Sequence, residues 1–452
     1  MIETSSDCNR FYSENFEGDW IVHAVPTEDG IHSADNTPCI LFIRNILTRK
    51  TYYYSLSHPD SIPKISIRPF LVQIWYKMSN RKKWALDTKA FYQLIGLPDV
   101  NDANLCGFLD NNEILDFSDF ETSAHKLVKR NSVGSGRINR SIPLLKHKES
   151  FDNMCTDIEK MVGIFKIDEP YTKFNDTIIK TLGKIEKNGI YVDSSLFYNY
   201  FKSSPNKDGL VFSKYNVYTS TGRPSNTFNG INYAALNTTD GSRSCFVSRY
   251  GNDGRMIVID YTTFHPRIIC NLVNYHLSIE TDIYEYLAKL YFQKKEVDET
   301  DIKNAKQLTF KQLYGGVENK YSHIKYLSNL KIFINEQWES FQKNGYIETP
   351  IFKRKITDKH IQDPNPTKLF NYILQAIEGE IAIPQLQLVM DYLQNHKSKC
   401  ILYTYDSILI DFHKDDGLQT LNNIRQIMSC NGMFPMKTYI GSSYHDLQLV
   451  NI

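Results

Sequence analysis

The chain has 452 residues, a length that predicts two or three folding units with a substantial core. Its 52 Lys and Arg residues balance its 51 Asp and Glu residues, so net charge neither indicates nor excludes a nucleic-acid partner. The sequence has no apolar run of the roughly 18 residues that a membrane span needs and no signal or transit pattern, and its eight scattered cysteines form no Cys-x-x-Cys pair. We therefore expect a soluble intracellular protein with reduced thiols and no disulfide framework, zinc site or membrane partner.

The N-terminal third combines strands and helices. Runs of β-branched and aromatic residues predict four strands, at residues 20–25, 39–46, 51–56 and 68–76. Helices are predicted to follow at residues 87–95, 103–109 and 154–165. Strands first and helices interleaved later indicate an α/β or α+β domain.

A basic segment at residues 125–148 lies within this region. Its seven cationic residues stand among Ser and Gly and are Lys126, Lys129, Arg130, Arg137, Arg140, Lys146 and Lys148. Such a segment is typical of a solvated connection between elements. The alternative is a loop that contacts nucleic-acid phosphates.

The middle of the chain leads into a polar loop. Residues 177–188 carry apolar side chains at 178, 179, 182 and 185, one face of a helix, which Gly189 ends before a strand at 190–193. A helix at 194–201 and a strand ending at 218 precede the turn-rich segment TSTGRPSNTFNGIN at 219–232. This segment is either an ordinary loop or, since it stands one strand before Asp260, the border of a site where Arg223 contacts a phosphodiester.

Two aspartates stand at the ends of predicted core strands. The run MIVI at 256–259 predicts a buried strand ending at Asp260, and Asp406 lies between the two hydrophobic runs of CILYTYDSILIDF, at the turn of a predicted hairpin. Either aspartate alone is explained equally well as a helix cap or a turn residue. Two carboxylates on adjacent strands, however, are an arrangement that binds a pair of Mg²⁺ ions, so the pair indicates nucleotidyl transfer.

A further helix is predicted at 301–316, ending at Gly315 and Gly316. Lys306, Phe310 and Tyr314 are spaced four residues apart and therefore share one helix face. This face is either half-buried core with a snorkelling lysine or a grip on a nucleoside triphosphate, with the lysine on the phosphates and the rings on the base.

Taken in order, these segments resemble the motifs of the family A DNA polymerases, relatives of bacterial DNA polymerase I and phage replicative enzymes. The family signature T-x-T-G-R-x-S matches residues 219–225, its downstream asparagine matches Asn232, and motif A, D-Y-S-Q-I-E-L-R, matches DYTTFHPR at 260–267. Motifs B and C and the N-x3-Q pattern match the following residues: Lys306, Phe310, Tyr314 and Gly315; Tyr405, Asp406 and Ser407; and Asn371 and Gln375. The resemblance covers roughly residues 175–452, and its order and spacing make it specific.

The resemblance implies an α/β (α+β) right-hand polymerase with palm, fingers and a short thumb, preceded by a ribonuclease H-like domain of the exonuclease type. It implies two Mg²⁺ ions at Asp260 and Asp406, with Tyr261 at the same metal site, and Lys306 as a catalytic cation. The implied contacts to an incoming deoxynucleoside triphosphate are Tyr261, His265, Lys303, Lys306, Phe310 and Tyr314. The implied contacts to primer–template DNA are Thr221, Arg223, Asn232, Arg267, Asn371, Gln375 and Tyr405.

Three positions depart from the family pattern. His265 stands where the family has a glutamate that closes the ribose 2′ side, and its bulk should preserve some sugar exclusion. Lys303 is the nearest substitute for the motif B arginine, whose position holds Ile302. Ser407 replaces the motif C glutamate, as in the single-subunit phage RNA polymerases, and therefore keeps a ribonucleotide-using enzyme as an alternative.

The N-terminal third resembles the proofreading 3′–5′ exonuclease domain of the same family in a degenerate form. The first-strand Asp-x-Glu ligands are replaced by Val25 and Thr27. Acidic residues that correspond to the other ligand positions are Asp87, Asp102 and Asp157. We expect a structural, DNA-guiding domain without proofreading.

The thumb is reduced as well. Only 25 residues separate Asp193 from Thr219, where the family places a long helical insertion. We expect an enzyme that is distributive alone, or whose grip on duplex DNA comes from a processivity or replisome partner or from the 125–148 segment.

The predicted domains are residues 1–160 (degenerate exonuclease-like), 161–218 (reduced thumb and connection), 219–277 with 366–452 (palm) and 278–365 (fingers). The predicted function is template-directed DNA synthesis from deoxynucleoside triphosphates with two Mg²⁺ ions and without proofreading. The alternatives are an RNA-synthesising or primer-making polymerase and a non-catalytic DNA-binding protein descended from a polymerase. The compact, eroded layout is typical of a phage or mobile-element enzyme, which would act in the cytoplasm of a bacterial host.

Overall fold

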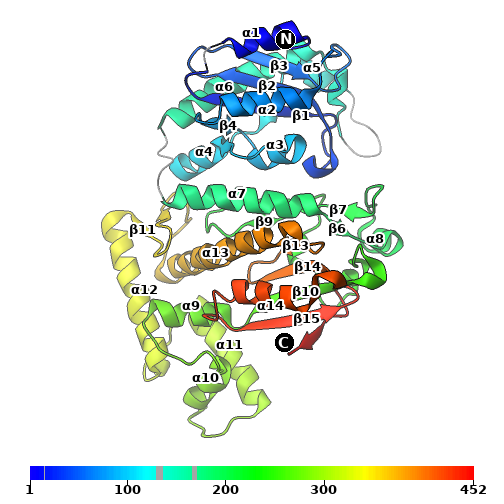
Figure 1. Cartoon of the computed structure of the whole chain (residues 1–452). Coiled ribbons are helices and arrows are strands. Elements are labelled where there is room, and N and C mark those ends of the chain that lie inside the picture. The colour runs from blue at the N-terminus through cyan, green and yellow to red at the C-terminus, as the bar shows by residue number, and fades with distance from the viewer. Residues whose placement is uncertain (15, 129–135, 165–169, 452) are drawn as a thin grey trace. The chain divides into compact units, whose positions relative to one another are not determined.

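The computed structural model describes all residues except 15, 129–135, 165–169 and 452 (Figure 1). It divides the chain into two compact units, Met1–Lys187 and Asn188–Ile452. The division falls later than the predicted domain boundary at residue 160. All eight cysteines are free thiols, and seven of them are buried. Among the described residues, no helix combines the length and the apolar character that crossing a membrane requires.

The first unit is built on a five-stranded mixed sheet with the order β3-β2-β1-β4-β5. Strands β1 (Trp20–Pro26), β2 (Pro38–Asn45) and β3 (Thr51–Ser55) pair antiparallel, while β4 (Lys83–Ala85) and β5 (Asn101–Asp102) pair parallel. Side chains alternate across β1, so Trp20 and Val22 enter one core cluster and Ile21 enters the other. The sheet is therefore covered on both faces, and three of the four predicted strands are confirmed.

Seven helices belong to the described part of this unit. They are α1 (Ser5–Tyr12), α2 (Ile67–Lys77), α3 (Thr88–Ile95), α4 (Ala103–Asn111), α5 (Ser123–Leu127), α6 (Leu144–Ile164) and α7 (Pro170–Asn188). The strand predicted at 68–76 is wrong, because α2 occupies this segment and buries Phe70, Leu71 and Ile74, whose spacing is helical. Helix α6 begins well before the predicted residue 154 and takes up the end of the basic segment, and residue 165 lies outside the described residues.

The second unit contains an antiparallel five-stranded sheet with the order β13-β14-β10-β15-β16. Its strands are β10 (Gly254–Tyr261), β13 (Lys399–Tyr403), β14 (Ser407–His413), β15 (Met436–Gly441) and β16 (Gln448–Val450). Helix α13 (Pro366–Tyr392) packs against β13 and against α14 (Gly417–Met428). Strand β10 is central and almost continuously buried, as its run of apolar residues predicted.

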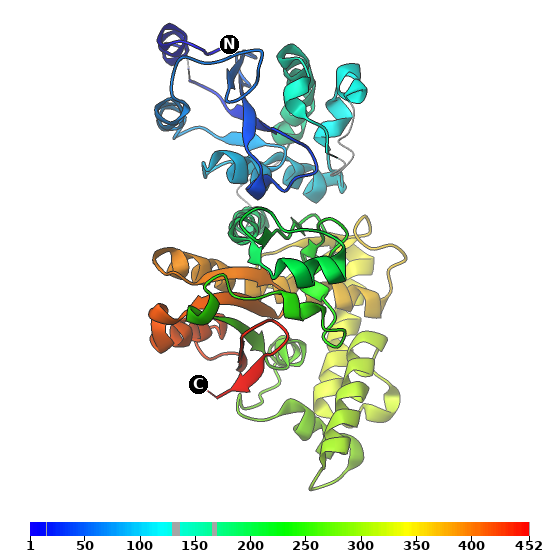
Figure 2. The same ribbon diagram turned by 90° about the vertical axis from the view of Figure 1, so that its right-hand side faces the viewer.

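The remaining helices of this unit lie beside the sheet. Helix α9 (Phe264–Leu272) follows β10, and α10 (Ile283–Phe292) packs along α11 (Glu299–Gly315). Helix α12 (Lys325–Asn344) and the hairpin of β11 (Tyr346–Glu348) and β12 (Lys355–Thr357) follow. Figures 1 and 2 show α10 and α11 side by side at the edge of the unit.

The segment between Asp193 and Thr219, in which a reduced thumb was predicted, folds into few elements. It contains helix α8 (Ser194–Phe201) and the two-residue strands β7 (Leu210–Val211) and β8 (Tyr215–Asn216). Strand β7 pairs with β6 (Ile190–Tyr191), and β8 pairs with β9 (Ser225–Asn226). The prediction of a single helix at residues 194–201 is confirmed.

Candidate active site

The two predicted aspartates meet at one end of the central sheet. In the antiparallel register of β10 and β14, Asp260 lies opposite Ser407, the residue after Asp406. The backbone N–H of Tyr261 donates to the carbonyl of Asp406 at 2.9 Å, which ties the hairpin turn to the end of β10. Tyr405 holds the turn in the left-handed region, with φ of 78°, a costly conformation for a residue with a side chain.

The electrostatics of the pair disfavour two bare negative charges. Desolvation and the charge of Asp406 raise the pKa of Asp260 to about 7, against the opposing influence of Lys437 and Lys306. Desolvation and the charge of Glu378 likewise raise the pKa of Asp406. Lys437 lies directly opposite Asp260 on the other neighbouring strand, β15. The site therefore gathers carboxylates at a place where a bound cation would relieve their repulsion.

A cleft of about 490 Å³ extends from these aspartates to α10 and α11. Lys306, Phe310 and Tyr314 all line it, and Tyr314 is 37% exposed. The Lys306 Nζ lies 5.9 Å from the Phe310 ring centre, and the Phe310 and Tyr314 rings stack with centres 5.9 Å apart at 25°. This face of α11 therefore lines a cleft and is not packed as core, and the nucleotide contact inferred from its spacing stays a prediction.

A chain of polar contacts forms one wall of the cleft. His265, on the first turn of α9, bonds through Nδ1 to the Tyr314 hydroxyl at 2.5 Å and through Nε2 to Glu378 at 2.7 Å. Glu378 also lies 3.6 Å from Nε of Arg223. The Arg223 guanidinium in turn stacks on the Tyr405 ring at 3.7 Å. Side chains from α9, α11, α13 and the loop at 219–223 are thereby joined.

The loop at 219–223 is held from behind by a buried arginine. Arg354, which is 2% exposed, donates through Nη2 to the carbonyls of Thr219 at 2.9 Å and Ser220 at 2.7 Å. Within the loop, Thr221 Oγ1 accepts from the N–H of Arg223, and Gly222 adopts φ of 75°. The segment is therefore a constrained loop that orients Arg223, not a solvated turn.

Several predicted contact residues stand apart from the lining of the cleft. Lys303 is exposed on α11, Gln375 is half-buried on α13, and Asn232 is exposed before a short 3₁₀ helix. The Asn371 amide donates to the carbonyl of Tyr314 at 3.4 Å, so Asn371 contacts the end of α11.

Arg267 requires a correction. It is 7% exposed, and its guanidinium donates to the backbone carbonyls of Ser278 at 2.8 Å and Ile279 at 3.2 Å. Burial lowers the pKa of Arg267, as expected for a cation withdrawn from water. The guanidinium is committed to the connection between α9 and α10 and is not presented to DNA as predicted.

Sequence reasoning missed other residues of the cleft, above all Glu378 and Lys437. Glu378 follows Asn371 by seven positions and Gln375 by three, which places it on the same helix face, so the spacing held a usable signal. No sequence signal pointed to Lys437, because only the pairing of β10 with β15 brings it opposite Asp260. Outside the matched motif segments, the other missed residues of the lining are Asp282, Tyr284 and Tyr439.

In the first unit, the residues that match exonuclease ligand positions have structural partners. Val25 is buried in β1, and the Thr27 hydroxyl bonds to Thr37. Asp87 and Asp102 accept backbone N–H groups at the starts of α3 and α4. Asp157 forms an ion pair with Lys160 at 2.7 Å.

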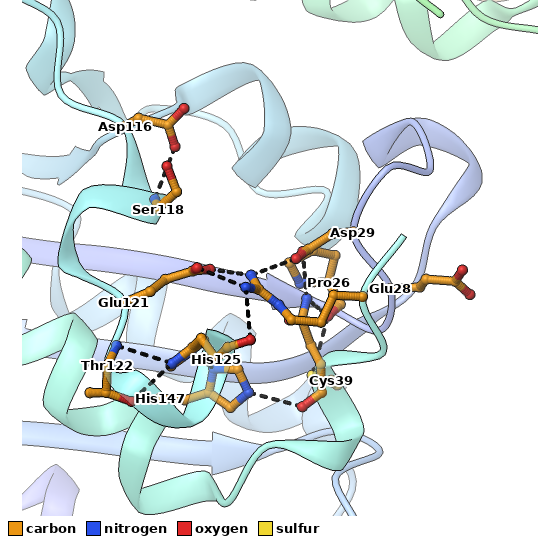
Figure 3. A network of polar contacts seen from close by, with 12 residues as sticks. Pro26, Glu28, Asp29, Cys39, Asp116, Ser118, Glu121, Thr122, His125 and His147 are labelled. Carbon is orange, nitrogen blue, oxygen red and sulfur yellow. Dashed lines mark hydrogen bonds and ion pairs between the residues drawn. The ribbon is translucent and has the colours of Figure 1, made fainter. Parts of the chain in front are cut away.

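The described part of the basic segment is largely tied into the same unit (Figure 3). Arg137 pairs with Glu121 and, at 2.6 Å, with Asp29. His125 Nε2 bonds to His147 Nδ1 at 3.2 Å, and His147 Nε2 bonds to the Asn139 carbonyl at 2.9 Å. Lys146 and Lys148 pair with Glu149 and Asp152 along α6, while Lys129 and Arg130 lie outside the described residues. The segment is therefore not the uniformly solvated connection that its composition suggested.

Comparisons with known proteins identify the fold. No family model matches the sequence, and no curated protein matches it. Among solved structures, the POL domain of Pol1 from M. smegmatis, in complex with DNA primer-template and dNTP, is similar with a TM-score of 0.69. The match covers 98% of this chain and 99% of that chain at 14% sequence identity. The chain therefore has the mixed α/β fold of a DNA polymerase domain, which confirms the predicted fold class.

Proposed function

We propose that the protein is a template-directed DNA polymerase of the family A type, which extends a primer 3′-hydroxyl with deoxynucleoside triphosphates. One observation carries the proposal: Asp260 and Asp406 meet at the end of a buried sheet and face Lys306 across a cleft, in a chain with a polymerase-domain fold. Carboxylates opposed to a cation and an aromatic platform suit a triphosphate that carries a base.

The carboxylate pair fits a pair of Mg²⁺ ions. In this proposal the two carboxylates are the side-chain ligands and Tyr261 stands at the same metal site; within the described residues, no group of three or more Asp, Glu, His or Cys side chains is arranged to hold a metal ion. Mg²⁺ binds in this way, through one or two carboxylates with substrate phosphates and water completing its shell. When bound, the ions would stabilise charge on the attacking and leaving oxygens of an in-line displacement.

The other residues of the cleft take separate tasks in this proposal. Lys306 neutralises charge on the triphosphate, and the stacked rings of Phe310 and Tyr314 support the base. The sugar then lies between the phosphates and the base, beside His265. Thr221, Arg223, Asn232, Asn371, Gln375 and Tyr405 are the proposed contacts to the primer–template, and residues 219–277 with 366–452 and 278–365 are the proposed palm and fingers.

The first unit is proposed to guide DNA without proofreading. Its support is the set of structural partners described above for Thr27, Asp87 and Asp102, which leaves these side chains occupied in the fold. The short segment at 194–218 further suggests weak hold on duplex DNA in the absence of a processivity partner. A full-length footprint of the protein alone on duplex DNA would count against weak hold.

Primer extension tests the proposal. The wild type and Asp260→Ala are incubated with a recessed primer–template, Mg²⁺ and either deoxy- or ribonucleoside triphosphates. Extension with deoxynucleotides that is lost in Asp260→Ala is expected, and a 3′-mismatched primer should not be shortened. Equal use of ribonucleotides would favour an RNA-synthesising enzyme, the alternative that Ser407 keeps open, and would mean that His265 does not exclude the ribose 2′-hydroxyl. Absence of extension with either set would contradict the proposal and favour a DNA-binding role.

A further inference from the structure

Glu378 is a buried carboxylate in the wall of the cleft. It is 1% exposed on the largely apolar helix α13, and burial of a carboxylate is costly unless cationic or hydrogen-bonding partners compensate it. Its partners are His265 at 2.7 Å and Arg223 at 3.6 Å.

These contacts fix the His265 ring at both nitrogens. A carboxylate only accepts hydrogen bonds, so Nε2 of His265 carries the proton that Glu378 accepts. The other nitrogen, Nδ1, meets the Tyr314 hydroxyl at 2.5 Å. Loss of the Glu378 acceptor would free one end of the ring, and the ring could then rotate or exchange its tautomer.

The position of the ring matters because of what surrounds it. The four residues assigned to the phosphates and the base all line the cleft. In the proposed function, Lys306 and Asp260 lie at the phosphates, and Phe310 and Tyr314 lie at the base. His265 lies next to Tyr314, where a nucleotide that joins the two ends places its sugar. A shift of the imidazole therefore changes the space available to substituents of the ribose ring.

We propose that Glu378 is a positioning residue that holds His265 against the sugar and thereby sets the preference for deoxy- over ribonucleotides. The inference rests on the proposed function and adds to it a residue outside the motifs that the sequence displays. Arg223 supports the same role, since it balances the charge of Glu378 and connects it to Tyr405 at the hairpin turn.

Single-nucleotide incorporation with the full chain tests this role. The measured quantity is the ratio of kcat/KM for a deoxynucleotide to kcat/KM for the matching ribonucleotide. Glu378→Leu is expected to lower this ratio about tenfold, the factor associated with one hydrogen bond to a charged group. Glu378→Gln keeps an acceptor oxygen and should retain most of the preference.

Two further variants separate positioning from general damage. Glu380, two residues along α13, is also buried but bonds to Thr349 and the N–H of Phe352 instead of the cleft wall, so Glu380→Leu should lose stability without a change in the ratio. In a His265→Ala background, Glu378→Leu should change the ratio less than about twofold, because the two residues act as one unit. An unchanged ratio in Glu378→Leu alone, or full additivity with His265→Ala, would overturn the proposal.

A readout without catalysis distinguishes this proposal from the function on which it rests. Nitrogen-15 NMR of labelled histidines, with His265→Ala for assignment, should show a proton on Nε2 of His265 in the wild type and a changed pattern in Glu378→Leu. If the wild type extends no primer, the preference is measured as the ratio of the affinities for dATP and ATP. Calorimetry gives these affinities for the protein on a chain-terminated primer–template. The positioning role would be refuted if the His265 signal were identical in the two proteins, or if Glu378→Leu weakened the binding of dATP and of ATP equally.

Discussion

Replacement of Asp260 by asparagine should stabilise the metal-free protein while it abolishes nucleotide incorporation. The pKa of Asp260 is raised to about 7 in the fold, from an ordinary value of 3.8. Between these values the folded state binds a proton that the unfolded state has released, so the stability of the wild type falls as pH rises. Asp260→Asn lacks this titration, and its advantage should therefore grow from near zero at pH 4 to its full size above pH 7.

The size of the effect follows from the same difference. At about 1.36 kcal/mol per pKa unit, a change from 3.8 to about 7 corresponds to an upper value of roughly 4 kcal/mol. Asp260 is only half-buried, so solvent screening reduces this, and we expect about 2–4 kcal/mol at pH 8. In a unit of this size such a change raises Tm by roughly 5–10 °C.

Thermal unfolding without Mg²⁺ at pH 5 and pH 8 measures the effect, and hydrogen exchange of peptides from β10 and β14 reports it locally. Asp446→Asn is the matched control, since Ser443 and Ser442 lower the pKa of Asp446 and its replacement should therefore destabilise the fold at neutral pH. Mg²⁺ at pH 8 should stabilise the wild type and narrow its gap to Asp260→Asn. Equal stability of the two proteins at pH 8, or a gap that shrinks between pH 5 and pH 8, would refute the reasoning.

Three further predictions concern other parts of the molecule. Lys306→Ala should lower kcat/KM for nucleotide incorporation about 100-fold. The control is Lys303→Ala, on the same helix but outside the lining of the cleft, which should change kcat/KM less than about threefold. Equal losses in the two variants would contradict the role of Lys306 at the triphosphate. Arg354→Met should cost roughly 2–4 kcal/mol of unfolding free energy in urea titrations, because two loop carbonyls lose their buried donor, and the loop at 219–223 should become sensitive to limited proteolysis. Burial lowers the pKa of His147 to about 4, so between pH 6.5 and 4 the unfolded state binds a proton that the folded state does not. The stability of the first unit should therefore fall as the pH is lowered through this range. A midpoint of urea unfolding that does not change between pH 6.5 and 4 would contradict this prediction.

Some features followed from sequence because they depend on local spacing. The run before Asp260 predicted β10, the two hydrophobic runs around Asp406 predicted the hairpin, and the four-residue spacing from Lys306 predicted one helix face. Local composition also misled, since β-branched and aromatic residues at 68–76 suggested a strand although the buried side chains follow a helical period. The segment was decided by packing against the sheet, which strand propensity does not encode.

Other features were decided only by the tertiary structure. Arg267 stands within the motif A segment, yet burial turns its guanidinium toward backbone carbonyls. Lys437 comes opposite Asp260 through strand register, and Glu378 meets His265 across 113 positions of sequence. Residue type and local spacing show which chemical groups a segment carries. Cross-strand pairing determines which of these groups share a cleft, and desolvation determines their pKa values. Pairing and desolvation both depend on how distant segments pack, which local sequence does not encode.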